Sequence, residues 1–596
     1  MRLLLTPVST TFLADPPRFL FFTGKGGVGK TSLACATALQ LAERGSQVLL
    51  VSTDPASNIG QVFDLQIGDH ITAVPSVPGL SALEIDPEQA AAAYRERIVG
   101  PVRGLLPERE LASITEQLSG SCTTEIASFD EFTGLLTDQA LARRFDHILF
   151  DTAPTGHTIR LLQLPASWTE YLTAGKGDAS CLGPLSGLDR QRATYAAAVA
   201  ALTDPTLTRM VLVARPQSSA LAEVARTAAE LRAIGIDSGQ VVLNGVLPAR
   251  AGDEPLATAI RQREEAAMAA MPNALAQVPT DVVSLKATNM VGVPALRSLL
   301  DEDAAEPVGA PGPESLPPAP TVATTGAPLR ALVDAIEQDG HGLVLCMGKG
   351  GVGKTTIAAA IAVALAERGH QALLTTTDPA AHVVETLAGS VDQLEVSRID
   401  PVEATQRYRE QVLATKGKGL DDAGRAVLAE DLRSPCTEEV AVFQQFSKVV
   451  HESRQRFVIV DTAPTGHTLL LLDAAGAYHR EVARQLGEAG NYTTPLMRLQ
   501  DPSQTKVVLV TLAEPTPVAE AEELQADLLR AGIQPWAWVV NNSLAAAGPT
   551  SAFLRQRAQN ERGPIARVVG QSNLVAVVPL LAREPVGEAA LSALTR

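Results

Sequence analysis

The chain has 596 residues, of which 46% are apolar and 19% charged, a composition typical of a globular protein with two or more domains. Its formal net charge of −17 argues against a general nucleic-acid binder, because neutralising phosphates requires a basic surface. No run of 18 apolar residues occurs, so the sequence predicts no transmembrane segment and we expect a cytoplasmic protein.

A glycine-rich phosphate-binding motif, G-x-x-x-x-G-K-[ST], occurs twice. Each copy lies between a short apolar stretch (18–22 and 343–347) and an Ala/Leu-rich helical stretch, which is followed by a second strand-like run (48–53 and 372–377). Glycines let backbone N–H groups surround a phosphate, the lysine adds charge, and the threonine hydroxyl can reach Mg²⁺. The sequence therefore predicts two ATP-binding P-loops, formed by Gly24, Gly26, Gly27, Val28, Gly29, Lys30, Thr31 and Ser32, and by Gly348, Gly350, Gly351, Val352, Gly353, Lys354, Thr355 and Thr356.

Three further motifs repeat in the same order, which indicates duplication of a whole domain. They are Asp-Pro-Ala at 54–56 and 378–380, a Cys-Thr-x-Glu segment at 122–125 and 436–439, and Asp-Thr-Ala-Pro-Thr-Gly-His-Thr at 151–158 and 461–468. Strand-like runs alternate with helical stretches in both halves, which predicts an α/β fold of two P-loop domains, each a mostly parallel sheet flanked by helices. We expect domains at 1–300 and 329–596, joined by a flexible, Pro-rich linker at 301–328.

Carboxylates at strand ends are the expected partners of the nucleotide. Asp54 and Asp378 follow the second strand of each half and are candidates for positioning the attacking water beside Mg²⁺. Asp151 and Asp461 follow a later strand and are placed like Walker-B carboxylates that hold Mg²⁺. The alternative for each is a helix N-cap or a turn residue.

Lys25 and Lys349, directly after the first glycine of each P-loop, are not required by the general motif. They resemble the additional lysine of the deviant P-loop ATPases, which dimerise face to face and use it on the partner's nucleotide. The resemblance implies that the two halves form an intramolecular pseudo-dimer. It also implies adenine contacts for Asn244 and Asn541, for which a turn-forming asparagine is the alternative.

The five cysteines include no Cys-x-x-Cys pair, which favours reduced thiols over a four-thiolate zinc site. Cys35 and Cys346 lie in apolar stretches and are expected to be buried. Cys122 and Cys436 are related by the duplication, and Cys181 lies in a loop-like context. Soft thiolates select soft ions, yet spacing alone leaves a three-thiolate site and structural cysteines both open.

Together with the doubled P-loop and the doubled Asp-Thr-Ala-Pro-Thr-Gly-His-Thr, the segments SCTTEIASFDEF and SCLGPLSGL make the chain resemble the ArsA family of arsenical pump-driving ATPases over nearly its full length. The resemblance implies Mg²⁺-dependent ATP hydrolysis, stimulated by arsenite or antimonite bound at three cysteines. It also implies a membrane carrier of the ArsB type, a metallochaperone of the ArsD type, and a place at the inner face of the membrane through that carrier. The implied metalloid site consists of Cys122, Cys181 and Cys436, with His157, His467 and Ser434 nearby.

Two other functions share the deviant P-loop. An ATPase that targets tail-anchored membrane proteins is the main alternative, but those are usually single-domain subunits, often with a Cys-x-x-Cys zinc site. A ParA/MinD-type positioning switch would want a basic surface or an amphipathic C-terminal helix, and residues 588–596 are too short and weakly amphipathic for the latter.

Overall fold

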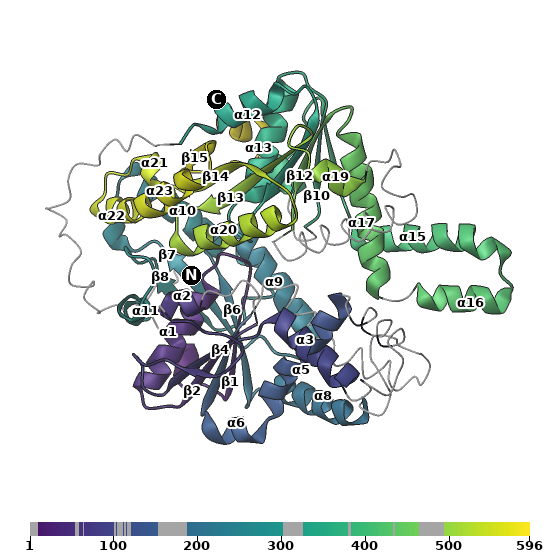
Figure 1. Ribbon diagram of the computed structural model, residues 1–596. Coiled ribbons are helices and arrows are strands. Elements are labelled where there is room, and N and C mark those ends of the chain that lie inside the picture. The colour runs from purple at the N-terminus through teal and green to yellow at the C-terminus, as the bar shows by residue number, and fades with distance from the viewer. Residues whose placement is uncertain are drawn as a thin grey trace. The chain divides into compact units, whose positions relative to one another are not determined.

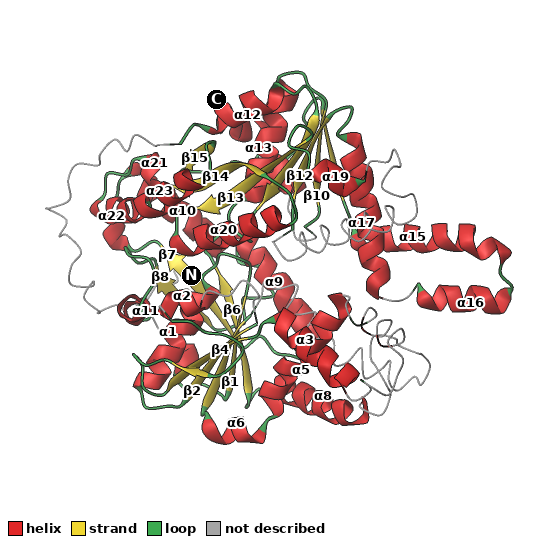
Figure 2. Cartoon of the chain, viewed as in Figure 1, coloured by secondary structure: helices red, strands yellow, loops and turns green. Residues whose placement is uncertain are grey.

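The computed structural model describes residues 10–53, 59–63, 65–100, 103, 111, 115, 118, 121–152, 188–301, 326–378, 383–432, 435–463 and 494–596. The chain divides into two compact units, Met1–Asp253 with Ala257–Ser315, and Glu254–Leu256 with Leu316–Arg596. Each unit is built on one sheet with helices on both faces, as Figures 1 and 2 show. The predicted α/β class is confirmed, while the predicted linker lies almost wholly outside the described residues.

The first unit contains an eight-stranded sheet in the order β3-β4-β2-β5-β1-β6-β7-β8, in which only β3 and β4 pair antiparallel. Its strands are β1 Phe19–Thr23, β2 Val48–Ser52, β3 Thr72–Ala73, β4 Leu80–Glu84, β5 His147–Asp151, β6 Thr208–Ala214, β7 Gln240–Val246 and β8 Thr280–Ser284. Its helices are η1 Thr11–Leu13, α1 Lys30–Glu43, α2 Ile59–Phe63, α3 Pro87–Val99, α5 Ser121–Thr137, α6 Gln139–Arg144, α8 Leu188–Thr203, α9 Ser218–Ala233, η4 Ala249–Ala251, α10 Pro255–Ala269 and α11 Val293–Leu299.

The second unit contains a seven-stranded, all-parallel sheet in the order β11-β10-β12-β9-β13-β14-β15. Its strands are β9 Gly342–Met347, β10 Ala372–Thr376, β11 Leu394–Arg398, β12 Phe457–Asp461, β13 Thr505–Leu512, β14 Pro535–Ser543 and β15 Val575–Pro579. Its helices are α12 Leu329–Glu337, α13 Lys354–Glu367, α14 Val383–Leu387, α15 Pro401–Thr415, η5 Lys416–Gly419, α16 Asp422–Asp431, α17 Pro435–Glu452, α19 Pro495–Leu499, α20 Pro515–Arg530, α21 Leu544–Ala547, α22 Ala552–Asn560, α23 Arg562–Gln571 and α24 Glu588–Ala593.

Both sheets place the P-loop strand between the same two neighbours. In the first, β1 pairs with β5 and β6, and Phe22 lies opposite Asp151. In the second, β9 pairs with β12 and β13, and Cys346 lies opposite Asp461. The carboxyl end of the P-loop strand therefore lies beside an aspartate in each half, at the edge of a parallel sheet where ligands bind.

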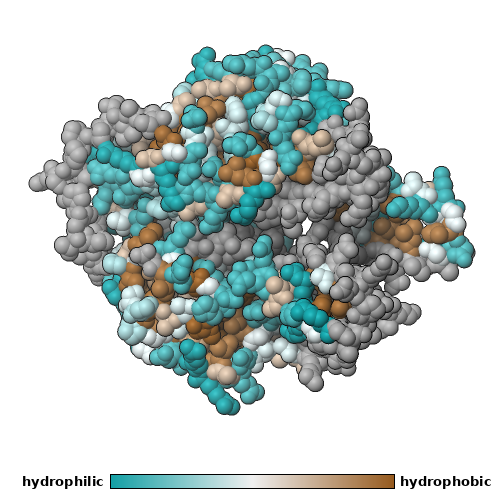
Figure 3. Space-filling model, viewed as in Figure 1, coloured by the Kyte–Doolittle hydropathy of each residue, from teal (hydrophilic) through white to brown (hydrophobic). Residues whose placement is uncertain are grey.

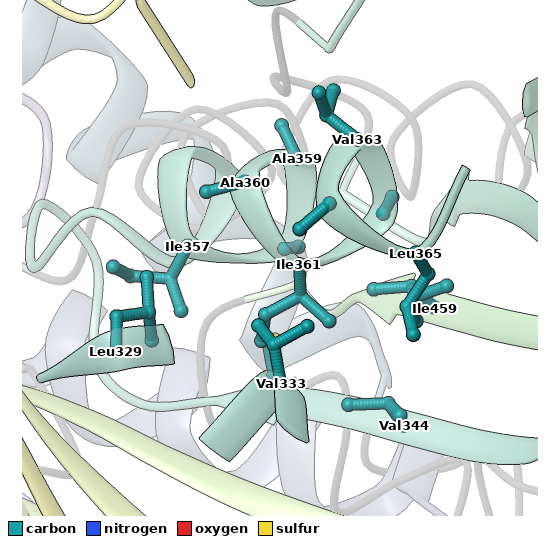
Figure 4. Packing of buried hydrophobic residues seen from close by; sticks show 14 of the residues in the cluster. Leu329, Val333, Val344, Ile357, Ala359, Ala360, Ile361, Val363, Leu365 and Ile459 are labelled. Carbon is teal, nitrogen blue, oxygen red and sulfur yellow. The ribbon is translucent and has the colours of Figure 1, made fainter. Parts of the chain in front are cut away.

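The helix that follows each P-loop is anchored by burial. In α13 every residue from Ile357 to Ala366 is buried, and Figure 4 shows its side chains packed against Leu329 and Val333 of α12 and against Val344 and Ile459 of the sheet. A helix that is apolar on all sides is stable only inside a core. This burial fixes the amino end of α13, and with it the P-loop.

A helical arm leaves the second sheet between β11 and β12. Asp400 caps α15 by accepting hydrogen bonds from the backbone N–H groups of Val402 and Glu403, and Asp86 caps α3 in the same way in the first unit. Figure 3 shows apolar surface on the arm of α15 and α16. Within the described ranges, no helix combines the length and the hydropathy that a bilayer span requires.

Candidate functional site

The two P-loops have nearly identical geometry. The backbone of Gly24 lies so close to β6 that an added Cβ would be 2.2 Å from the carbonyl oxygen of Val213. A Cβ added to Gly348 would likewise be 2.3 Å from the carbonyl oxygen of Val510 in β13. The last glycine of each loop, Gly29 or Gly353, has φ of +89° or +91° and precedes the helix. Both positions exclude a side chain, so the loop stays narrow and its N–H groups can turn toward an anion.

The motif lysines fold back over the loops that carry them. Lys30 Nζ lies 3.4 Å from the carbonyl oxygen of Lys25, and Lys354 Nζ lies 3.0 Å from that of Lys349. Each motif lysine is only 6% exposed. Their charge is thus held inside the loop, where it can neutralise a bound phosphate.

A threonine–aspartate pair completes each loop. Thr31 Oγ1 donates to Asp151 Oδ2 at 2.7 Å, and Thr355 Oγ1 donates to Asp461 Oδ2, also at 2.7 Å. Both aspartates are 1% exposed. Each is the last residue of the strand next to the P-loop strand, whereas the sequence predicted that it would directly follow that strand. The Walker-B and P-loop candidates are therefore brought together in both halves.

Burial raises the pKa of Asp461 to about 6, against the lowering effect of the Lys354 charge and of the Thr355 hydrogen bond; the charge of Asp378 raises it further. Its Oδ1 atom is buried and has no hydrogen-bond partner among the described residues. A carboxylate and a hydroxyl are hard oxygen donors, the class that Mg²⁺ prefers. The residues present therefore fit this ion.

The water-positioning candidates are only partly described. Asp378 lies two residues after β10, and its backbone N–H donates to Thr376 Oγ1 at 3.0 Å. The charge of Asp378 is one of the causes that raise the pKa of Asp461. Asp54, its counterpart, lies outside the described residues.

Asn244 and Asn541 contact the P-loops directly. Asn244 Nδ2 donates to the carbonyl oxygen of Val28 at 2.8 Å, and Asn541 Nδ2 donates to that of Val352 at 2.9 Å. Both side chains are less than 10% exposed. Because a carbonyl oxygen only accepts hydrogen bonds, this contact fixes the orientation of the amide. The asparagines hold the P-loops, and an additional adenine contact stays a prediction.

The additional lysines of the two P-loops, Lys25 and Lys349, are called the signature lysines below, and they differ in their surroundings. Lys349 Nζ forms an ion pair with Glu520 of α20, whose side chain is 7% exposed. In the first half the buried Glu223 of α9 instead pairs with Arg226, at 2.7 Å. No ion pair of Lys25 is found in the part of the chain that the structure describes.

The sequence analysis did not identify two buried glutamates that lie next to the strands of Asn244 and Asn541, β7 and β14. Glu264 Oε2 accepts from the backbone N–H of Leu247, and Glu561 Oε1 accepts from that of Leu544, both at 2.9 Å. Burial raises the pKa of both carboxyls, that of Glu264 to about 7. Each glutamate lies 20 positions after its asparagine, a repeated spacing that could have revealed them.

Much of the predicted metalloid site lies outside the described residues: Cys181, His157, His467 and Ser434 entirely, and the side chains of Cys122 and Cys436. The backbone places Cys122 and Cys436 as the second residues of α5 and α17, equivalent helices of the two units. Cys35 and Cys346 are fully buried, and burial raises the pKa of both thiols. These two remain protonated and are poor metal ligands.

Comparison with known proteins gives a consistent result. A family model described as "Anion-transporting ATPase" matches residues 17–302, 341–498 and 491–596. The "Arsenical pump-driving ATPase" of Escherichia coli is 61% identical over 97% of this chain and 98% of its own length. That of Acidiphilium multivorum is 60% identical over 96% and 98%. A "Putative arsenical pump-driving ATPase" of Halobacterium salinarum is 34% identical over 96% and 93%.

Proposed function

The chain belongs to the family of anion-transporting ATPases, and on that basis we propose that it powers an arsenite and antimonite efflux pump through Mg²⁺-dependent ATP hydrolysis at two sites. It is an ATP hydrolase of the arsenical pump-driving type. The observation that carries the nucleotide part is the Thr–Asp pair, repeated at 2.7 Å beside a buried P-loop lysine in both units.

Each P-loop has the groups that phosphoryl transfer to water requires. The loop N–H groups and Lys30 or Lys354 hold the phosphates, and Thr31 with Asp151, or Thr355 with Asp461, holds the metal. Mg²⁺ held by these residues would supply positive charge to the phosphates. Asp54 and Asp378 orient the water, a role suited to a carboxylate just beyond a strand end.

We further assign each site to both halves. Lys25 and Lys349 act on the nucleotide held by the opposite half, as the signature lysine does in the deviant P-loop ATPases. The duplicated loops support this assignment, because each half supplies one complete P-loop and one additional lysine. Hydrolysis then depends on closure of the two halves.

Metalloid binding is proposed to drive that closure. Cys122, Cys181 and Cys436 bind As(III) or Sb(III) as three thiolates, with His157, His467 and Ser434 nearby. The placement of Cys122 and Cys436 in the first turns of equivalent helices supports the assignment, because the amino end of a helix lowers the pKa of a thiol. The segments from Asp151 to His157 and from Asp461 to His467 can each span about 20 Å if extended, which is enough to connect a phosphate site with a metalloid site.

The proposed partners follow from the transport role. The ATPase works at the cytoplasmic face of the membrane on a carrier of the ArsB type, and it receives metalloid from a chaperone of the ArsD type.

The test is the ATPase rate as a function of antimonite concentration, for the wild type and for Cys122→Ser, Cys181→Ser and Cys436→Ser. We expect stimulation in the wild type and its loss in each variant, with the basal rate retained. Cys35→Ala is the matched control, because Cys35 is buried in α1 and should leave stimulation intact. A wild type without stimulation, or serine variants that respond normally, would refute the metalloid assignment.

A further inference from the structure

The environment of the signature lysines differs between the halves, and one helix accounts for the difference. In the second half, Lys349 extends from the P-loop to Glu520, in the second turn of α20. The lysine side chain is 15% exposed and the glutamate 7%. A partly buried pair is less screened by solvent than a surface pair, so it restrains the lysine appreciably.

The first half contains the same glutamate with a different partner. Val213 and Val510 are equivalent, because the carbonyl oxygen of each lies against the first P-loop glycine. In this register Glu223 of α9 corresponds to Glu520 of α20, and Arg226 corresponds to Glu523. Glu223 forms its ion pair with Arg226, three residues further along the same helix.

The replacement of Arg226 by Glu523 in the second half explains why Glu223 and Glu520 have different partners. Residues three apart lie on the same face of a helix, so Arg226 reaches Glu223 without help from the P-loop. Glu523 offers no positive charge to Glu520. Glu520 pairs instead with Lys349, so that the ion pair joins α20 to the P-loop.

We propose that Glu520 is a positioning residue that retains Lys349 within its own half and thereby makes the two nucleotide sites unequal. The proposal rests on the assignment above that the signature lysines act on the opposite half. The site that needs Lys349 becomes competent only after the Lys349–Glu520 pair opens, whereas no ion pair of Lys25 that would have to open is found among the described residues. Any ligand that favours the closed state must supply the free energy that opens the pair.

The principal test compares Glu520→Gln in the full-length protein with Glu223→Gln. Glutamine keeps the size of the side chain and removes its charge. We expect Glu520→Gln to raise the ATPase rate without antimonite on the order of fivefold, the effect of losing one modest ion pair. The maximal rate at saturating antimonite should stay unchanged. Glu223→Gln, which releases Arg226 and not a signature lysine, should change neither rate.

A reciprocal pair of charge exchanges tests the same idea without removing the glutamate. Glu523→Arg gives Glu520 the local partner seen in the first half and should raise the basal rate as Glu520→Gln does. Arg226→Glu should draw Lys25 to Glu223 and lower the basal rate. In the wild type the basal rate should rise with ionic strength as the pair is screened, and this rise should be absent in Glu520→Gln.

Lys349→Met separates this proposal from the assignment on which it rests. If Lys349→Met leaves the antimonite-stimulated rate unchanged, the proposed role of the signature lysine is wrong. If it lowers that rate while Glu520→Gln and Glu523→Arg leave the basal rate at or below wild type, the lysine role stands and the restraint by Glu520 is refuted. If the proposal holds, Glu520→Gln has no effect in a Lys349→Met background.

Discussion

The hydroxyl of Thr355 donates a hydrogen bond to Asp461 Oδ2 at 2.7 Å, at the bottom of the second P-loop. The carboxylate is 1% exposed, and burial raises its pKa to about 6. A buried carboxylate whose charge is so poorly compensated by the protein alone is prepared to receive a cation.

Asp461→Asn should weaken Mg²⁺-dependent ATP binding at the second site by about 10- to 100-fold, because it removes a charged carboxylate and leaves a neutral amide. The measurement is a titration of the variant with a non-hydrolysable ATP analogue, with and without Mg²⁺. Metal-free nucleotide binding should be retained, since Lys354 and the loop are untouched. Equal Mg²⁺ dependence in variant and wild type would contradict the assignment of Asp461.

Gly29→Ala should abolish nucleotide binding at the first site. An alanine Cβ would lie 2.3 Å from Asn244 Nδ2, so either the loop or the asparagine must move. Gly45→Ala is the matched control: Gly45 has φ of +97°, close to the +89° of Gly29, but nothing lies within 4 Å of its added Cβ. Both variants bear the strain of a positive φ, about 1–2 kcal/mol.

Calorimetry with an ATP analogue distinguishes the two glycine variants. The stoichiometry should fall from two sites to one in Gly29→Ala and stay at two in Gly45→Ala. A fall in both would mean that backbone strain, and not the contact with Asn244, is responsible.

Asn541→Asp tests whether this residue holds the P-loop or reads the base. The substitution brings a carboxylate oxygen to the position 2.9 Å from the carbonyl oxygen of Val352, where the two repel. Leaving a buried acceptor unsatisfied costs about 1–3 kcal/mol, and 1.4 kcal/mol is tenfold in affinity. We therefore expect KM to rise by about tenfold for ATP and GTP alike.

Asn542→Asp is the control for that substitution, because Asn542 is the next residue and is exposed. It should leave both KM values unchanged. A loss confined to ATP in Asn541→Asp would instead show that the asparagine recognises adenine, as the family resemblance implies.

Most of the fold could be predicted from sequence because the central strands of both sheets are buried on both faces. Such strands appear as continuous apolar runs, and β2 and β10 each end within one residue of the predicted limits. The repeated motifs supplied the order of elements. The Asp-Thr-Ala-Pro-Thr-Gly-His-Thr motifs begin at the ends of β5 and β12, and the Cys-Thr-x-Glu segments lie at the starts of α5 and α17. The arsenical pump family could be named on motif identity, and the comparisons bear this out.

The contacts that distinguish the halves could not be predicted in this way. Lys349 and Glu520 are 171 positions apart, and a glutamate on a helix looks like any solvated residue until the register of β13 against β9 brings α20 to the P-loop. The same holds for Asn541, whose contact with Val352 requires β13 to lie between β9 and β14. Long-range packing, not local sequence, sets these pairs.

Glu264 provides a prediction about pH. Its buried carboxylate accepts from the backbone N–H of Leu247 at 2.9 Å, and burial raises its pKa from 4.5 to about 7. Between these two values the folded protein binds more protons than the unfolded chain, so stability falls as pH rises. The stabilising contribution is complete below pH 4.5 and is lost as pH rises through 7.

Glu264→Gln removes this titration but keeps an oxygen that can accept from Leu247. The variant should therefore gain stability relative to the wild type when the pH is raised from about 5 to about 7.5, by roughly 2 kcal/mol at most. Thermal unfolding of both proteins at the two pH values measures the difference. Glu265→Gln, at the neighbouring position where the side chain is exposed, should show no such change. If the midpoints of thermal unfolding of Glu264→Gln and of the wild type shift in parallel with pH, the carboxylate is already charged in the folded protein at pH 5. Burial would then not raise the pKa of Glu264.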